Sequence, residues 1–342
     1  MKSTPKLLAL AATLGLITIS LASPVKAEDS KAMEVFETLT SATLIPNSPA
    51  ETLLDDLQSS APTVGEPPVR VPNRSSQSVV MTTRNNELIS IGLPFGKLNS
   101  DGQVVAGRSI SFDNKNGSTT VLLPKTDGSV QVATIIDGVS APTSFSYPLS
   151  LPAGGRALVS SSGLVLILDS QGQYAAAVAP PWAIDAKGVK VPTRFELRGN
   201  WLVQSVDHLI NKVTYPVVAD PWFGVDMIDR TSWNKTSEFS PTLSVYPSAW
   251  GRAVALATTY PLSSGFLGVA DQLSSTAAWS EALSKTARAS YPNPGTPTMR
   301  AQFDCHFFWV SKRHPRKVSW NLDTLRPYAS MVLLAQKNCN VE

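Results

Sequence analysis

The stretch from Ser78 to Asp220 constrains the fold most, because short apolar runs alternate there with turn signals. Runs such as ELISIGLP, QVVAGRSISF and WLVQSVDHL show the two-residue alternation of strands that bury one face. Asp–Gly, Asn–Gly and Gln–Gly pairs separate the runs about every ten residues, and such pairs favour tight turns. The pattern predicts an antiparallel all-β domain, sandwich or barrel-like, over residues 78–222 and disfavours an α/β enzyme fold.

Residues 223–342 have a mixed pattern. TAAWSEALSKTA, at 276–287, is rich in helix formers, whereas RAQFDCHFFWV and KVSWNL alternate like strands. None of the eight Trp precedes Trp182 and six lie from Trp222 onward, so the two parts build different cores. We therefore expect a multidomain chain, in which the all-β domain is followed by a small α+β domain with one disulfide.

The N-terminus has the pattern of a secretory signal peptide over residues 1–27. Lys2 and Lys6 precede an apolar stretch that ends near Ala22, and small residues permit cleavage after Ala27. The alternative is an uncleaved anchor, which needs about 20 apolar residues, and this stretch is shorter. The mature protein is expected to be extracellular or attached to the cell envelope.

Two segments precede the all-β domain. Residues 28–60 are expected to be helical, because Ser48, Pro49 and Glu51 form a helix-start signature. Residues 61–77 are rich in Pro, which cannot continue a helix, so they are expected to form a linker or an extended arm.

The charge balance argues against nucleic acid as a partner. Three of the 29 basic residues lie in the signal sequence, so 26 basic residues face 26 acidic ones after cleavage. A chain near neutrality is not expected to bind nucleic acid or, in general, anionic membranes. No later segment has spanning length, so no stable membrane insertion is expected after cleavage. One basic run, residues 312–317, is interpreted as a solvated turn, with a phosphate-binding patch as the alternative.

Cys305 and Cys339 are the only cysteines, and an even number in an exported chain predicts a disulfide. If residues 299–309 form a strand, Cys305 faces the core and the adjacent His306 faces the other way. His306 could not then act as the base for Cys305. The alternative, a catalytic thiol, also requires exposure and a polar setting that this position lacks.

The opposite face of the same predicted strand carries the candidate catalytic residues. Asp304 could orient His306 as a general base, and Arg326 could approach from the later segment. The alternative is a solvated polar edge or a structural hydrogen-bond network. Convergence of the three side chains in a concave pocket would distinguish a catalytic site from these alternatives.

Other chemistries have little support in the sequence. The three His have no spacing typical of metal ligands, and there is no Cys-x-x-Cys, GxSxG or Gly-rich phosphate loop. We therefore expect neither a metal nor another cofactor.

Two parts of the chain resemble known sequences. Residues 180–222, which end in YPVVADPW, resemble the closing part of a β-rich module of secreted actinobacterial proteins. SVYPSAWGR, MRAQFDCH, VSWNLDTLRP and the final CN resemble, in this order, domain-of-unknown-function family 2599. The resemblance implies an exported protein of a Gram-positive envelope and supplies no mechanism.

The expected function is that of a secreted or envelope-associated, non-enzymatic binding protein. Exposed aromatic side chains on the β scaffold could stack on a cell-wall glycan, although the Trp residues could instead fill the core. Another secreted protein is the second possible partner. The alternative function is a C-terminal effector or hydrolase domain that uses an Asp-oriented His.

Overall fold

The computed structural model describes residues 34–35, 37–39, 69–210, 212–235, 239, 241–260, 268–286 and 293–339. The expected signal peptide lies outside the described residues, as does most of the expected helical segment. Within that segment 34–35 and 37–39 are helical, and Val35 and Leu39 pack against a small cluster of the β sheet. In the part of the chain that is described, no helix is both long and apolar enough to span a bilayer.

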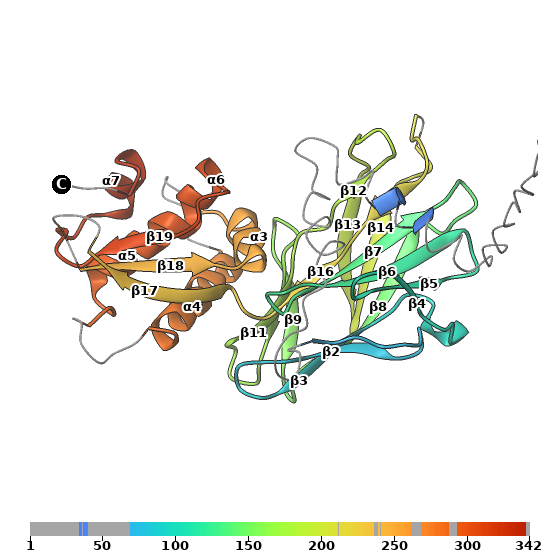
Figure 1. The fold of residues 1–342 in the computed structure, drawn as a ribbon, viewed down its shortest axis with the longest axis horizontal. Coiled ribbons are helices and arrows are strands. Elements are labelled where there is room, and N and C mark those ends of the chain that lie inside the picture. Colours follow the sequence, from blue (N-terminus) through green and yellow to red (C-terminus); the bar gives the residue numbers. More distant parts are fainter. Residues whose placement is uncertain are drawn as a thin grey trace, which may run out of the picture.

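Two lobes lie next to each other along the long axis of the molecule (Figure 1). We call residues 69–225 the β lobe and residues 226–339 the C-terminal lobe. The expected order, an all-β part followed by a small α+β part with one disulfide, is confirmed. The ordered β structure begins earlier than expected, because strand β1 (Val69–Arg70) lies within the stretch predicted to be a linker.

The β lobe consists of two antiparallel sheets whose inward side chains share one core. The six-stranded sheet has the order β1-β2-β3-β8-β14-β13 and comprises, besides β1, the strands β2 (Ser78–Thr82), β3 (Leu88–Gly92), β8 (Ser144–Ser150), β13 (Thr193–Arg198) and β14 (Trp201–Val206). The ten-stranded sheet comprises β4 (Gln103–Ala106), β5 (Ser109–Asp113), β6 (Ser118–Pro124), β7 (Val130–Ile136), β9 (Arg156–Val159), β10 (Val165–Leu168), β11 (Tyr174–Val178), β12 (Ala183–Ile184), β15 (Val217–Ala219) and β16 (Trp222–Gly224).

Strand β8 shows how the sequence pattern produces this arrangement. Phe145, Tyr147 and Leu149 are buried, while Ser144 and Ser146 alternate with them on the outer face. In three of the turn pairs recognised in the sequence, the glycine adopts the positive φ that a tight turn requires, at Gly117, Gly128 and Gly172. Alternation and turn chemistry together therefore specify the β lobe.

The C-terminal lobe packs helices on a three-stranded antiparallel sheet with the order β17-β18-β19. Its elements are β17 (Ile228–Asn234), β18 (Thr242–Pro247), α3 (Ala249–Ala257), α4 (Val269–Ser284), α5 (Pro297–Cys305), the π-helical turn η3 (His306–Val310), α6 (Ser311–Arg313), β19 (Trp320–Asp323) and α7 (Met331–Gln336). Helix α4 and strand β19 confirm the local predictions made from TAAWSEALSKTA and KVSWNL. The predicted disulfide between Cys305 and Cys339 is present.

The strand predicted for residues 299–309 is wrong, because this stretch forms α5 and η3. Thr296 caps the helix, accepting a hydrogen bond from the Met299 N–H, and Pro297 occupies the first turn. Met299, Phe303 and Phe307 recur every four residues and are fully buried. A short, almost continuous apolar run fits the two-residue period of a strand as well as the period of a helix. The Thr–Pro signal of a helix start is what distinguishes the two structures here.

The two lobes share a second hydrophobic core at their junction. Trp222 of β16 contacts Trp250 of α3 edge to face, with ring centroids 5.5 Å apart, and Leu166 of β10 belongs to the same cluster. The close approach requires a glycine at position 224, where a Cβ atom would lie 2.6 Å from the Trp250 ring. The lobes are therefore joined by packed side chains as well as by the chain itself.

Candidate functional site

The three candidate catalytic side chains each bond to different partners. Asp304 accepts a hydrogen bond from Arg300 Nε at 2.7 Å and another from the Ser275 hydroxyl of α4. Arg326 donates through Nε to Asp323 Oδ2 at 2.7 Å, and its guanidinium lies 4.3 Å from the ring centroid of Phe239.

His306 is buried in a third environment. Its Nδ1–H donates to the Gln302 carbonyl at 2.8 Å, and its Nε2 lies 3.4 Å from the Lys317 ammonium, which can only donate. Burial and the Lys317 charge lower the pKa of His306 to about 4, so the ring is neutral at pH 7. On a helix, residues two apart point to different sides, which is why His306 and Asp304 do not share a face as the strand prediction required.

Gln302 shows what this part of α5 does. Its side-chain amide donates to the Asp323 carbonyl at 2.9 Å and accepts from the Asp323 N–H at 2.8 Å. The Gln302 amide thus pairs with both backbone groups of Asp323, as a residue of an adjacent strand would, and this pairing fixes the helix to strand β19. These contacts form a structural hydrogen-bond network, which is the alternative that the sequence left open. None of the three candidate residues lines the pockets described below.

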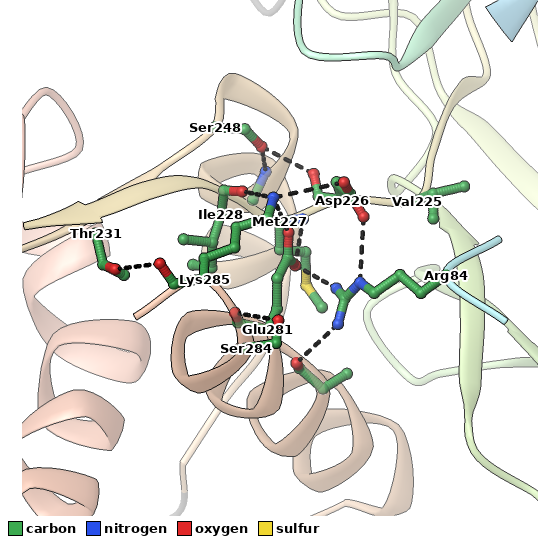
Figure 2. Close-up of polar contacts among 12 residues, drawn as sticks. Arg84, Val225, Asp226, Met227, Ile228, Thr231, Ser248, Glu281, Ser284 and Lys285 are labelled. Atoms are coloured by element: carbon green, nitrogen blue, oxygen red, sulfur yellow. Dashed lines mark hydrogen bonds and ion pairs between the residues drawn. The ribbon is translucent and has the colours of Figure 1, made fainter. Parts of the chain in front are cut away.

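The lobe junction contains a cluster of charges that the sequence did not predict (Figure 2). Arg84, on the turn between β2 and β3, reaches across to the carboxylates of Asp226 and Glu281, with 3.1 Å between Arg84 Nε and Asp226 Oδ1. Glu281 Oε1 accepts from Lys285 at 2.8 Å, one turn further along α4. Glu281 Oε2 also accepts the Met227 N–H at 2.9 Å.

Glu281 forms ion pairs with both cations of this cluster. Its side chain is fully buried, and burial raises its pKa, while the charges of Arg84 and Lys285 act in the opposite direction. A neighbouring pocket of about 320 Å³ is lined by Arg84 and Lys285 together with Asp127, Asp226 and Asp229. Arg84 belongs to the β lobe, whereas Asp226, Glu281 and the Ala277 carbonyl, to which it donates, belong to the C-terminal lobe, so the cluster holds the lobes together. No local sequence signal could identify it, since Arg84 and Glu281 are 197 residues apart.

A larger groove lies on the outer face of the six-stranded sheet. It encloses about 580 Å³, and Trp201, Pro148, Ser146 and Ser144 line it from adjacent strands β14 and β8. Trp201 is 45% exposed, whereas the other seven Trp are buried or half-buried. The core interpretation of the aromatic residues therefore holds for most of them, Trp320 included, and Trp201 is the exception.

Two loops form the walls of this groove. One is the turn around the short 3-10 helix η2 (Gly96–Leu98), where Phe95 and Asn99 adopt left-handed backbone with φ of 57° and 50°. The other is the β5–β6 turn with Asn114, Lys115 and Asn116. The lining combines hydroxyl and amide side chains with a larger area of apolar surface. Among the described residues that line it there are two lysines and no carboxylate.

The described residues provide no candidate metal-binding site. Among the described residues, no group of three or more His, Cys, Asp or Glu side chains is placed to hold a metal ion. The groove instead provides a flat aromatic surface together with hydrogen-bond donors and acceptors. This combination suits recognition of an uncharged or anionic polar ligand.

Comparisons with known proteins concern the C-terminal lobe. Residues 228–342 match the model of the family described as "Protein of unknown function (DUF2599)". The chain is 36% identical over 114 residues to Uncharacterized protein Rv0477 of Mycobacterium tuberculosis and to Uncharacterized protein Mb0487 of Mycobacterium bovis. The aligned region covers 33% of this chain and 65% of each relative. No solved structure matches the chain. The resemblance to the DUF2599 family is therefore confirmed for residues 228–342.

Proposed function

We propose that the protein is an exported, non-enzymatic binding protein whose β lobe binds a saccharide in the Trp201 groove. The single observation that carries this proposal is the exposed indole of Trp201 in a groove of about 580 Å³ lined by serine and asparagine side chains. Export is supported by the signal-like N-terminus and by a disulfide, since disulfides persist in oxidising compartments.

Saccharide chemistry matches the two kinds of surface in the groove. A pyranose ring has an apolar C–H face, which packs on a flat aromatic ring, and a rim of hydroxyl groups. Ser144, Ser146 and Asn116 supply the donors and acceptors that such a rim requires. Trp201 has a rigid side chain, so it can provide contact area at a small cost in conformational entropy.

Binding without cleavage is favoured by the groove's composition. Glycoside hydrolases generally place two carboxyl groups on either side of the scissile bond. The described residues that line the groove include no Asp or Glu. The groove can therefore hold and orient a sugar, but it lacks the acid–base pair for hydrolysis.

Isothermal titration with defined oligosaccharide fragments of a bacterial cell wall tests the proposal. Trp201→Ala should weaken binding at least about tenfold, because truncating a central Trp typically costs about 2 kcal/mol. Ser146→Trp should abolish binding by filling the groove. Leu88→Ala is the matched control, since Leu88 is 56% exposed on the same sheet and does not line the groove.

Two results would contradict the proposal. One is unchanged saccharide affinity in both groove variants, with the fold preserved by circular dichroism. The other is that no fragment binds measurably, while wild type and Trp201→Ala both bind the same secreted protein with equal affinity. The second outcome would favour the alternative partner, another secreted protein.

A further inference from the structure

The floor of the Trp201 groove carries no charged side chain. Trp201 pairs in register with Pro148 of β8, and Gly92 of β3 lies so close to Pro148 that a Cβ atom there would be 2.8 Å from the proline ring. Serine side chains of β2 and β8 complete the floor. The charged residues among the described lining, Lys97 and Lys115, both lie on the loops that form the walls. Any charge selectivity of the groove therefore depends first on these two lysines.

The two lysines differ in their partners. Lys115 Nζ lies 2.9 Å from Asp113 Oδ2, so its charge is matched by a carboxylate. No other described residue forms a hydrogen bond or an ion pair with the Lys97 ammonium. Carboxylates on segments next to the groove are bonded to cations of their own, in the pairs Asp101–Arg74 and Glu196–Arg198. Within the described part of the chain, Lys97 is thus the cation of the groove that has no carboxylate partner.

The backbone of Lys97 is held in a fixed turn. The Asn99 side chain, two residues on, accepts a hydrogen bond from the hydroxyl of Ser76, which also lines the groove. On the other side of Lys97, the Phe95 ring contacts Phe145 of the core edge to face, with ring centroids 6.0 Å apart. The turn itself therefore need not be ordered when a ligand binds, and this lowers the conformational cost of a contact with Lys97.

We propose that the groove is selective for an acidic saccharide, whose anionic substituent pairs with Lys97 while a sugar ring packs on Trp201. The inference rests on the saccharide binding proposed above and names the class of sugar. Both side chains line the same groove of about 580 Å³, a size typical of small-molecule sites. The substituent can be a carboxylate or a phosphate, since both accept charge-assisted hydrogen bonds from an ammonium group.

The charges of the groove disfavour other classes of sugar. A sugar with a free amino group would meet two ammonium groups and, among the described lining residues, no carboxylate. An uncharged sugar would gain no ion pair from Lys97. An anionic substituent would supply the counter-ion that the described residues do not.

Isothermal titration with probes that share one disaccharide frame tests the inference. The neutral probe is N,N′-diacetylchitobiose. The acidic probes are the disaccharide of N-acetylglucosamine and N-acetylmuramic acid, which adds a lactyl carboxylate, and N,N′-diacetylchitobiose 6-phosphate. At least one acidic probe should bind about threefold to fivefold more tightly than the neutral one, as a partly exposed ion pair predicts, and high salt should reduce the difference. The acidic probe that is preferred identifies carboxylate or phosphate as the substituent.

Variants separate the role of the charge from that of the aromatic ring. Lys97→Met should remove the preference for the acidic probe, and Lys97→Glu should reverse it. Trp201→Ala should weaken the binding of neutral and acidic probes alike, because the indole contacts the sugar ring. Lys190→Met is the matched control for net charge, since Lys190 is exposed on the β lobe and does not line the groove. This control should keep the preference of wild type.

Three results would overturn the inference. If wild type bound neutral and acidic probes equally, and Trp201→Ala weakened both, the charge selectivity would be refuted and saccharide binding would stand. If an acidic preference persisted in Lys97→Glu, the anionic substituent would have another partner. If no probe bound measurably, saccharide binding itself would be contradicted, together with the selectivity that rests on it.

Discussion

Arg84 of the β lobe forms an ion pair with the buried carboxylate of Glu281 in α4, and the same guanidinium bonds to Asp226 in the segment that joins the lobes. Lys285 completes the cluster from the next turn of α4. A buried carboxylate is costly unless it is paired, so the position of one lobe on the other is coupled to the stability of both.

Removing Arg84 should therefore destabilise the protein. Arg84→Ala is expected to lower the free energy of unfolding by about 2–4 kcal/mol, because Glu281 stays buried with Lys285 as its remaining cation. Arg84→Met/Glu281→Leu should recover most of the loss. Urea unfolding measures both. The control is Arg194→Ala, which breaks an exposed pair with Asp207 and should cost less than about 1 kcal/mol.

Packing at the lobe junction gives a steric prediction. Gly224→Ala should destabilise the protein by more than about 1 kcal/mol, because the new Cβ would lie 2.6 Å from the buried Trp250 ring. Gly138→Ala is the matched control, since a Cβ there meets nothing within 4 Å. Equal melting temperatures for the two variants would contradict the close packing of the junction.

Acid should destabilise the C-terminal lobe through His306. Burial and Lys317 lower the pKa of His306 to about 4, against 6.5 for the unfolded chain. The folded state thus binds its proton less readily, and stability is lost as the pH falls from about 6.5 towards about 4. Lys317→Met should raise the pKa of His306, as NMR titration of the ring would show. His314→Gln, in the exposed turn, should leave this acid dependence unchanged.

Asp220 should have the opposite dependence. Burial raises the pKa of Asp220 to about 8, while Gln131 Nε2 donates to its Oδ2 at 2.9 Å. The folded state favours the protonated carboxyl, so this contribution is complete below about pH 3.8 and is lost as the pH rises through about 8. Asp220→Asn should flatten the stability profile of the β lobe between these values. Unfolding measured across this pH range in both proteins checks the prediction, and parallel profiles would contradict it.

The disulfide should stabilise the C-terminal lobe appreciably. Cys305 and Cys339 are 34 residues apart, and closing a loop of this length stabilises the folded state by about 3–4 kcal/mol in the chain-entropy model. Cys305→Ala/Cys339→Ala should lower the free energy of unfolding by about that amount. Both cysteines are buried, so reductant without denaturant should react slowly. Rapid reduction of the native protein would contradict this burial.

The sequence was sufficient wherever a local pattern has one structural solution. The alternation of buried and outward-facing residues in stretches such as those that form β2 and β8 is typical of antiparallel strands. The RAQFDCHFFWV stretch was mispredicted because its apolar residues fit periods of both two and four. That error placed Asp304 and His306 on one face, and only the helix shows that they contact different elements.

The sequence by itself determined the class of the β lobe, the order of the lobes and the pairing of the two cysteines. The first two follow from residue periodicity and turn chemistry, and the third follows from the presence of two cysteines only. All of these are properties of the sequence alone. Only the tertiary structure decided which Trp is exposed, that Arg84 meets Glu281, and that Lys97 lines the same groove as Trp201. Each of these depends on contacts between residues distant in the chain, and burial and charge pairing arise only when such segments pack together.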